Sequence, residues 1–289
     1  MRGYKALASR RSNGYVSRMF YLGICAIIKD EDRFLDEWLA YYTALGAEAF
    51  YLYDNGSVIP LSESLGHYLG HRSAESFRIH EVPGEKLQLD AYMHCVQTYK
   101  NQCRWLAFVD MDEFIVPLER ASIPELLEGY ENFSGLALSW KVFGTNGHIF
   151  PPEGLQIESY TRAIEPDHFL HWHVKSVADP SRVGFFRTPH LPGLIENSPP
   201  VVDVLGRPVT TPVIKPPVWE TAQVNHYYYR SRKEYYAKLR KPRADNNELR
   251  TDAVEGRVTA PEGYSEDISA VRFAPKVKTI MRDMTDSRV

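Results

Sequence analysis

Uninterrupted apolar runs in the first half of the chain predict buried β-strands. Three of them cover residues 20–28, 49–53 and 105–110. A continuous run of this length is typical of a strand covered on both faces of a sheet. Between the first two runs, apolar residues recur at helical spacing from Phe34 to Leu45. The order strand, helix, strand predicts a βαβ unit, and with it an α/β fold.

Cap and turn residues mark the ends of these elements. Asp30 is the expected N-cap of the first helix, and Gly46 is its expected C-terminal stop. Two further helices are predicted to start at capping boxes, at Ser122–Glu125 and at Ser231–Glu234. The other expected elements are a strand at 76–82, a helix at 86–101, a helix over 123–129 and a strand at 135–143.

We expect three parts along the chain. Residues 1–18 form a basic lead-in, residues 19–280 a single domain, and residues 281–289 a tail. Eight prolines between residues 189 and 218 predict an irregular excursion within the domain.

Composition narrows the class of protein. The 289 residues include 44% apolar and 25% charged side chains, which are ordinary globular values and exclude disordered, collagen-like and disulfide-scaffold proteins. Lys and Arg total 34 against 37 Asp and Glu, so the formal net charge is −3. This near-neutral balance argues against a dedicated nucleic-acid-binding protein, whose domain is usually basic.

Cysteine usage and the apolar runs bear on the compartment. Cys25, Cys95 and Cys103 are odd in number and lack C-x-x-C spacing, so they support neither a disulfide framework nor a structural zinc site. This usage favours a reducing compartment. The N-terminal residues 1–15 contain no apolar signal core, and the run 19–28 is about half the ~20 residues that span a bilayer. We expect a cytoplasmic protein, with peripheral contact to the inner face of a membrane left open.

Three carboxylates follow the third apolar run, at Asp110, Asp112 and Glu113. Ligands of open α/β sheets gather at the carboxyl ends of the strands, where this tract would lie. Mg²⁺ and Mn²⁺ prefer oxygen ligands and keep coordination sites for phosphate oxygens. The tract therefore predicts a divalent cation that neutralises a diphosphate leaving group. A solvated acidic turn is the alternative explanation.

Two more segments fit such a site, and each also has a structural explanation. The turn Asp54–Ser57, which includes Asn55, follows the second apolar run, and turns of this composition are commonly structural. His226 precedes an aromatic, basic tract that ends at Arg243. The cations of that tract suit a diphosphate, a nucleic acid or an anionic membrane, and equally a solvated helix face.

His168, His171 and His173 resemble a metal cluster, and the last two would share one face of a strand. Apart from Asp167, no Cys or acidic residue stands at zinc spacing. A structural or substrate-contacting role is therefore favoured.

Several stretches, taken in order, carry a resemblance to a known family. They are IIKDEDRFLDEWLAYYTALGAEAFYLYDNGS, then Gln88 with Ala91-Tyr92 and Cys95, then RWLAFVDMDEF, SWKVFG, KSV with PH, and NHYYYRSRKEYYAK. Together they resemble glycosyltransferases of the family-2-like and family-92 group over about residues 20–280. The segment from DEDRFLDEW to YDNGS and the DMDEF segment are the most specific parts.

This resemblance implies a GT-A-type α/β fold with a mostly parallel central sheet. It implies transfer of a sugar from a nucleotide donor, with inversion and with Mn²⁺ or Mg²⁺ as the metal. The favoured donor is a UDP-sugar, and the acceptor is a glycan or another hydroxyl compound, as in polysaccharide biosynthesis. Residues 19–150 would be the nucleotide- and metal-binding half, and residues 151–280 the acceptor half.

The resemblance also implies roles for the acidic tract and for the late histidine. Asp110 and Asp112 match the D-x-D that holds the metal and the donor phosphates or ribose, and Asp112 is expected to be catalytic. Glu113 and Phe114 match the DEF extension. His226 matches the histidine that completes the metal coordination.

Donor contacts are implied at four other positions. Asp54, with Asn55 beside it, matches the acidic residue that contacts the nucleoside. Lys175 and Arg230 match basic positions near the phosphates.

The acceptor side is less defined by the sequence. Inversion needs a base within reach of the acceptor hydroxyl, and Glu158, Glu165 and Asp167 lie in the appropriate part of the chain. We prefer Glu158, although each of the three is equally explained as a surface charge. Trp140 and the loop residue Asn146 are candidate acceptor contacts, and a buried core position is the alternative for the tryptophan.

The sequence therefore predicts a metal-dependent, inverting glycosyltransferase, and two other classes stay open. A metal-dependent phosphohydrolase or nucleotidyltransferase would share the carboxylates, although the chain has neither a P-loop nor a Gly-rich N-terminal loop. A non-catalytic protein that binds carbohydrate or a membrane surface would bind no nucleotide with a metal.

Overall fold

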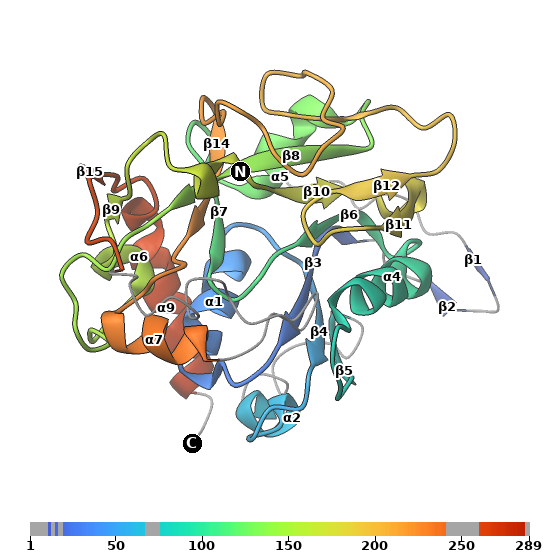
Figure 1. Cartoon of the computed structure of the whole chain (residues 1–289). Coiled ribbons are helices and arrows are strands. Elements are labelled where there is room, and N and C mark those ends of the chain that lie inside the picture. The colour runs from blue at the N-terminus through green and yellow to red at the C-terminus, as the bar shows by residue number, and fades with distance from the viewer. Residues whose placement is uncertain (1–10, 13–14, 17–19, 67–75, 241–259, 287–289) are drawn as a thin grey trace.

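A mixed β-sheet runs through the centre of the molecule (Figure 1). The computed structural model describes residues 11–12, 15–16, 20–66, 76–240 and 260–286. Within these ranges the strand order of the sheet is β5-β4-β3-β6-β10-β8-β14-β7, with β13 also paired to β8. The N-terminal strands are β3 (Phe20–Ile28), β4 (Ala49–Asp54), β5 (Phe77–Glu81) and β6 (Cys103–Phe108).

These four strands are parallel to one another. The later strands form the other side of the sheet. They are β7 (Glu113–Pro117), β8 (Gly135–Val142), β10 (Val174–Ala178), β13 (Val201–Val202) and β14 (Ala222–His226). β10 is antiparallel to both β6 and β8, β13 and β14 are parallel to β8, and β7 is antiparallel to β14. The expected α/β fold with a mostly parallel central sheet is confirmed.

This topology brings distant segments to one edge of the sheet. Because β10 is antiparallel to both of its neighbours, β6 and β8 run in the same direction, and β14 runs with them. The carboxyl ends of β3, β4, β6 and β14 therefore share an edge with the amino ends of β7 and β10. Ligands of such sheets gather at this edge.

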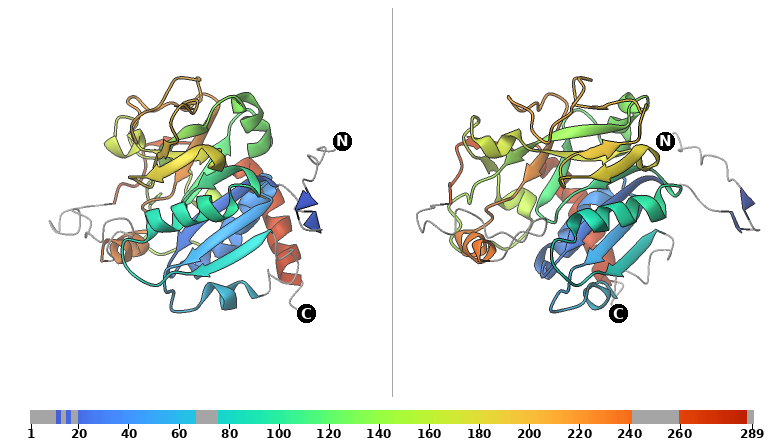
Figure 2. Two further views of the ribbon diagram at one scale, coloured as in Figure 1. Left: turned by 90° about the vertical axis from the view of Figure 1, so that its right-hand side faces the viewer. Right: turned by 45° about the vertical axis from the view of Figure 1, so that its right-hand side comes forward.

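Two layers of helices cover the two faces of the sheet. The helices are α1 (Asp32–Ala44), α2 (Leu61–Ser64), α4 (Gln88–Tyr99), α5 (Ile123–Leu127), α6 (Gln156–Ser159), α7 (Arg232–Leu239) and α9 (Ala274–Asp286). Along β3, Ile24 and Ala26 pack in one core with α1 and α9, whereas Cys25 and Ile27 pack in another with α4. Figure 2 shows α4 and α9 on these opposite faces.

Small elements complete the chain. They are the pairs β1 (Arg11–Ser12) with β2 (Tyr15–Val16), β9 (Arg162–Ala163) with β15 (Ser265–Glu266), β11 (Val183–Phe186) with β12 (Pro192–Leu194), and the 3₁₀ turns η1 (Glu128–Tyr130), η2 (Phe169–Trp172), η3 (Pro180–Arg182) and η4 (Val271–Phe273). Most of the basic lead-in, and residues 241–243 of the basic tract, lie outside the described residues.

Several sequence predictions about caps are confirmed, and one is wrong. Gly46 has a positive φ of 98° just after α1, as a C-terminal stop requires. The Ser231–Glu234 capping box has both of its hydrogen bonds, and the Ser122 side chain caps α5. Asp30 is not the N-cap of α1, which has Glu31 there. The Asp30 carboxylate instead accepts a hydrogen bond from the backbone of Val58, across the edge of the sheet.

The later elements differ most from the prediction. β7, β10, β14 and α9 were not predicted: the three strands are only five residues long each, and α9 is a largely polar 13-residue helix. α9 extends to Asp286, so the expected tail at 281–289 begins as helix. His171 and His173 do not share a strand face, because residues 169–172 form η2. The three cysteines are buried and free, and no helix in the described ranges is long and apolar enough to cross a membrane.

Candidate active site

The acidic tract forms the turn between β6 and β7, and its backbone is fixed from three directions. The Asp110 carbonyl accepts a hydrogen bond from Trp38 Nε1 of α1 at 3.1 Å. The Asp112 carbonyl accepts one from the backbone of Tyr227, just after β14, at 2.8 Å. The Glu113 carboxylate accepts one from the backbone N–H of Asp110 at 2.8 Å. The turn is therefore preorganised before any ligand arrives.

The Asp110 carboxylate is held by side chains from α4 and β10. Gln88 Nε2 donates to its Oδ1 at 2.8 Å, and Tyr92 Oη lies 3.4 Å from the same atom. Lys175 Nζ donates to its Oδ2 at 3.0 Å. Asp110 still has a side-chain exposure of 35%, so the carboxylate is oriented but reachable.

Lys175 joins Asp110 to the interior. Its ammonium lies 3.3 Å from Glu113 Oε2, and both of these side chains are buried. Burial works against the charge of Lys175, yet the carboxylates of Asp110 and Glu113 hold its pKa well above the ordinary value. Burial raises the pKa of Glu113 to about 8, although Lys175 opposes this shift. Lys175 is thus a fixed cation at the root of the turn.

The Asp112 carboxylate has a different set of partners. Its Oδ1 lies 3.4 Å from His226 Nε2, and its Oδ2 lies 2.6 Å from Lys238 Nζ. Burial opposes ionisation of Asp112, but Lys238 and His226 hold its pKa well below the ordinary value. Burial lowers the pKa of His226, although Asp112 opposes this, which favours the neutral imidazole that metals bind.

These residues fit part of a divalent-metal site. Asp112 and His226 present an oxygen and a nitrogen ligand side by side, and His226 Nδ1 is buried with no partner among the described atoms. The described ranges hold no preformed group of three or more His, Cys, Asp or Glu side chains that could take a metal. Asp110 lies on the same turn, but its carboxylate is engaged by α4 and β10. Mg²⁺ is commonly held by one or two protein carboxylates, with phosphate oxygens and water supplying the rest.

Arg230 is a buried anchor between segments and does not face an open site. Its guanidinium donates to Gln156 Oε1 at 2.9 Å, to Glu31 Oε2 at 2.7 Å and to the Met111 carbonyl at 3.3 Å. It also lies 3.5 Å from the centroid of the Phe34 ring. Arg230 therefore fixes the middle of the acidic turn against α1 and α6.

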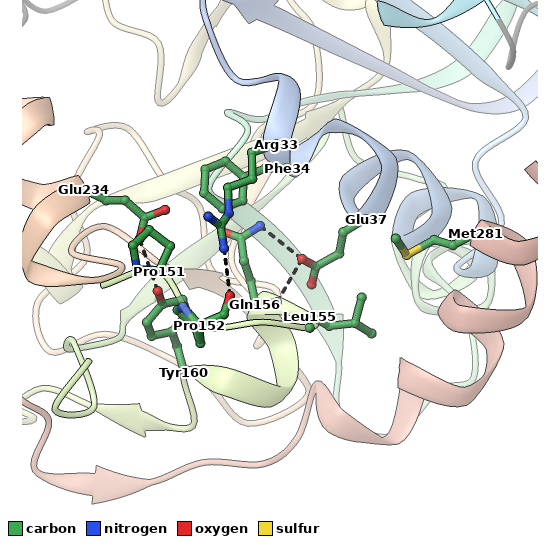
Figure 3. Close-up of a pocket in the computed structure, with 11 residues that line it drawn as sticks. Arg33, Phe34, Glu37, Pro151, Pro152, Leu155, Gln156, Tyr160, Glu234 and Met281 are labelled. Carbon is green, nitrogen blue, oxygen red and sulfur yellow. Dashed lines mark hydrogen bonds between the residues drawn. The ribbon is translucent and has the colours of Figure 1, made fainter. Parts of the chain in front are cut away.

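A cavity of about 240 Å³ is lined by residues of α1, α6, α7 and α9, among them Gln156, which is a partner of Arg230. Figure 3 shows Glu37 reaching across it to Gln156. The Glu37 carboxylate accepts hydrogen bonds from the backbone N–H groups of Gln156 and Ile157 at 2.8 and 3.2 Å. Burial raises its pKa to about 7, although these hydrogen bonds oppose the shift. Glu37 thus holds the α6 segment that in turn holds Arg230.

The two predicted nucleoside contacts are occupied by their own turn. Asp54 Oδ1 accepts from Ser57 N at 2.8 Å, and Oδ2 accepts from Leu61 N at 2.9 Å, at the start of α2. Asn55 Nδ2 donates to the carbonyls of Val82 and Gly84. Both residues lie at the expected edge of the sheet, and the contacts described for them are structural.

Trp140 lies beside His226 in a cluster of aromatic rings. The two ring centroids are 4.2 Å apart, and those of His173 and His190 lie 5.0 and 5.1 Å from the tryptophan. Trp140 is buried, and its Nε1 has no partner among the described atoms. The indole therefore lies next to Asp112 and His226, but it is not a surface platform.

The remaining acceptor-side predictions lie away from this cluster. Asn146 organises its own loop, since its Oδ1 accepts from the backbones of Thr161 and Arg162. Glu158 Oε1 pairs with Lys278 Nζ of α9 at 2.7 Å. Of the three early histidines, His171 is buried and accepts a hydrogen bond from Val142 N. Burial lowers the pKa of His171 to about 4, so its role is structural.

Sequence reasoning assigned no role to five residues that shape the site. Gln88 and Tyr92 were noted only as part of the resemblance, and Lys238 only as one cation of the tract. His190 and Glu37 lie in stretches that carry the resemblance, but neither was given a role, because neither has a local pattern. The capping box was a usable signal for Lys238: it fixes where α7 begins, and hence which of its residues face the turn.

Comparison with known proteins identifies the family to which the chain belongs. The model of glycosyltransferase family 92 matches residues 20–260. Glycosyltransferase family 92 protein At1g27200 of Arabidopsis thaliana is 29% identical over 140 residues, which are 46% of this chain and 24% of that protein. Family 92 protein RCOM_0530710 of Ricinus communis is 26% identical over 163 residues, which are 53% of this chain and 26% of that protein. The chain thus matches about a quarter of the length of these relatives.

Two solved structures are similar over a smaller part of the fold. S. aureus TarS 1-349 in complex with UDP has a TM-score of 0.36 and 11% identity, over 56% of this chain and 47% of that chain. Glucosyl-3-phosphoglycerate synthase of Mycobacterium tuberculosis has a TM-score of 0.28 and 10% identity, over 42% of this chain and 44% of that chain. The family match, by contrast, extends over most of the chain.

Proposed function

The chain belongs to glycosyltransferase family 92, and from that premise we propose that it transfers a sugar, with inversion, from a nucleotide-sugar donor to a glycan or another hydroxyl acceptor. The observation that supports this most is the meeting of Asp112, His226 and Lys238 at the carboxyl edge of the sheet. An anionic ligand group, an imidazole and an ammonium within hydrogen-bonding range suit the binding of a diphosphate with a metal.

We propose Asp112 and His226 as the residues that hold Mn²⁺ or Mg²⁺, with Asp110 on the same turn. A bound divalent cation would neutralise the charge that develops on a nucleoside diphosphate leaving group. The protein's own part is to keep this turn rigid, through the backbone contacts from α1 and β14, so that little reorganisation accompanies binding.

We propose that the donor binds at the acidic turn, on the side where the Asp110 carboxylate is exposed. Asp110 is oriented by Gln88, Tyr92 and Lys175, which leaves one reachable carboxylate for the ribose or the sugar hydroxyls. We keep UDP as the favoured nucleotide on the strength of the family resemblance. On the acceptor side, the Trp140 ring packs against His226, and the rings of His173 and His190 pack against Trp140, which favours this cluster over Glu158.

Calorimetric titration with UDP and Mn²⁺ tests this proposal directly. We expect UDP to bind only when Mn²⁺ is present, and other nucleoside diphosphates to bind more weakly. Asp112→Asn should abolish this binding, whereas Asp32→Asn, in a D-x-D of the same spacing at the exposed start of α1, should retain it. No binding of any nucleotide by the wild-type protein contradicts the proposal and favours a non-catalytic carbohydrate-binding protein.

A second assay separates the enzyme classes. Incubation with UDP-sugars and no acceptor should leave the donor largely intact, with at most slow release of free sugar. Rapid cleavage within the diphosphate that leaves a sugar phosphate would instead indicate a phosphohydrolase or nucleotidyltransferase, which could share the same carboxylates.

We also propose that a membrane surface contacts the face at the start of α7. Ile149 and Phe150 are 56% and 67% exposed there, and Lys233 Nζ lies 5.7 Å from the Phe150 ring centroid. Exposed apolar side chains beside a cation suit an anionic lipid surface. Co-sedimentation with phosphatidylserine vesicles, but not with phosphatidylcholine vesicles, is expected and should be lost in Phe150→Ser. Equal recovery with both vesicles contradicts the proposal.

We also propose that the protein is cytoplasmic. Fractionation of cells that carry a tagged chain tests this location. Recovery of the chain in a secreted fraction contradicts it.

A further inference from the structure

The two carboxylates of the acidic turn are each paired with a lysine, but the two pairs are built differently. The Lys175 side chain on β10 is 1% exposed and is shared by Asp110 and Glu113, so its ammonium cannot move towards solvent. Lys238 on α7 is 27% exposed, and its Nζ lies 2.6 Å from Asp112 Oδ2. Of the two, only Lys238 lies at the rim, with a long side chain that can move while its helix stays in place.

The Lys238 ammonium is held by exchangeable partners. Besides Asp112, its Nζ donates to the Tyr228 carbonyl at 3.2 Å and lies 4.0 Å from the centroid of the Tyr228 ring. α7 itself is anchored by the complete Ser231–Glu234 capping box, so the side chain and not the helix would move. An ammonium on a flexible stem that starts at a fixed helix can exchange one anion for another nearby.

Lys238 and a divalent cation would compete for the same carboxylate. Asp112 Oδ2 faces Lys238 and Oδ1 faces His226, so both oxygens already have positive or donating neighbours. A cation bound at Asp112 and His226 would repel the ammonium at this distance. A donor diphosphate arriving with that cation would offer Lys238 a new anionic partner.

We propose that Lys238 is a built-in counter-ion, which neutralises Asp112 in the ligand-free protein and pairs with the donor diphosphate once a divalent cation takes Asp112. This inference rests on the proposed function and gives Lys238 a positioning role within it. No bond is made or broken in the exchange; two ion pairs replace one. Removing the Lys238 charge should therefore change Mn²⁺ affinity and UDP affinity in opposite directions, and an experiment can detect that difference.

The test uses Lys238→Met, which keeps a similar stem length and removes the charge, and Lys233→Met as a matched control on the exposed side of the same helix. Mn²⁺ affinity is measured by calorimetry without nucleotide, and UDP affinity is measured with saturating Mn²⁺. In Lys238→Met we expect Mn²⁺ to bind about tenfold tighter, because the ammonium that repels the cation is gone. We expect UDP to bind about tenfold more weakly, because a charged contact to the diphosphate is lost. The control should change neither affinity.

Other results decide between explanations. If Lys238→Met weakens both affinities, the lysine only supports the structure, and the inference is overturned; unchanged Mn²⁺ affinity overturns it as well. Lys238→Arg, which keeps the charge, should restore Mn²⁺ affinity to near the wild-type value and so separates loss of charge from loss of folding. A wild-type protein that binds neither Mn²⁺ nor UDP overturns the proposed function itself, whereas wild-type binding with a failed Lys238→Met result overturns only this inference.

Discussion

Two acidic strand ends of the same sheet show how differently a carboxylate can be used. At the end of β4, both Asp54 oxygens accept backbone N–H groups from the following turn. After β6, the carboxylates of Asp110 and Asp112 are held mainly by side chains from α4, β10, β14 and α7. A backbone partner ties a carboxylate to its loop, whereas an ammonium or imidazole leaves it able to exchange ligands. Position at a strand end is therefore insufficient, and the partner decides the function.

Asp112→Asn should give the largest effect and sharpen this contrast. The substitution removes the charge that pairs with Lys238 and would hold the metal. We expect sugar transfer to fall by about 10³-fold, which corresponds to about 4 kcal/mol of lost transition-state stabilisation. Transfer is measured from labelled UDP-sugar, and circular dichroism checks that the fold is retained. Asp32→Asn is the control and should keep full activity. Full activity in Asp112→Asn as well would show that the acidic turn has no part in the reaction.

Glu37→Gln tests the scaffold behind the turn through its pH dependence. The folded pKa of Glu37 is about 7 against an ordinary 4.5, so its contribution to stability is full below pH 4.5 and is lost as the pH rises through 7. The wild type should lose about 3 kcal/mol more unfolding free energy than Glu37→Gln between about pH 4 and about pH 8. Urea titrations across this range measure the difference. Parallel curves for the two proteins would mean that Glu37 does not titrate in this window.

Asp54→Asn tests the other side of the comparison. Because one of its two backbone hydrogen bonds would lose its acceptor, we expect the unfolding free energy to fall by about 1 kcal/mol. UDP affinity should stay within about twofold of the wild-type value. The pairing of a thermal melt with calorimetry distinguishes the roles. A large loss of UDP affinity at unchanged stability would make Asp54 a nucleoside contact, as the family resemblance implies.

Glu158→Gln should have the smallest effect. Its carboxylate forms a partly exposed ion pair with Lys278, and such pairs contribute about 0–1 kcal/mol to stability. We expect transfer activity within about twofold of wild type, since this ion pair lies on α6 and α9 and not in the acidic turn. Steady-state rates at saturating donor and acceptor are the measurement. A loss of several hundredfold with kept stability would instead identify Glu158 as the general base.

The first strand, the first helix and the second strand could be predicted because their sequences are locally unambiguous. Residues 20–28 are apolar throughout and become β3, and the helical spacing from Phe34 to Leu45 becomes α1. β10 and β14 gave no such signal. They are short, and Lys175 and His226 sit within them as buried polar residues, so the pattern that marks a strand is interrupted by the groups that serve the site.

The site could be predicted only as a set of candidates. Family resemblance selected Asp110, Asp112 and His226, and the structure brings the last two into contact. The resemblance could not show that the Arg230 guanidinium is hydrogen-bonded to Glu31, Gln156 and the Met111 carbonyl. Those contacts join segments far apart in the chain. Nor could spacing single out Lys238 from its neighbouring cations, since only the docking of α7 decides which one faces the turn.

The Arg230 anchor also has a consequence for the order of assembly during synthesis. The arginine and Glu31 are separated by 199 positions, and His226 and Lys238 lie equally late in the chain. A ribosome that has released residues 20–120 has released the whole parallel layer and the acidic turn, but none of these late partners. Contacts of such long range form late and slow folding. The nascent chain therefore holds Asp112 without its partners His226 and Lys238 for more than a hundred residues of translation, until β14 and α7 have been synthesised.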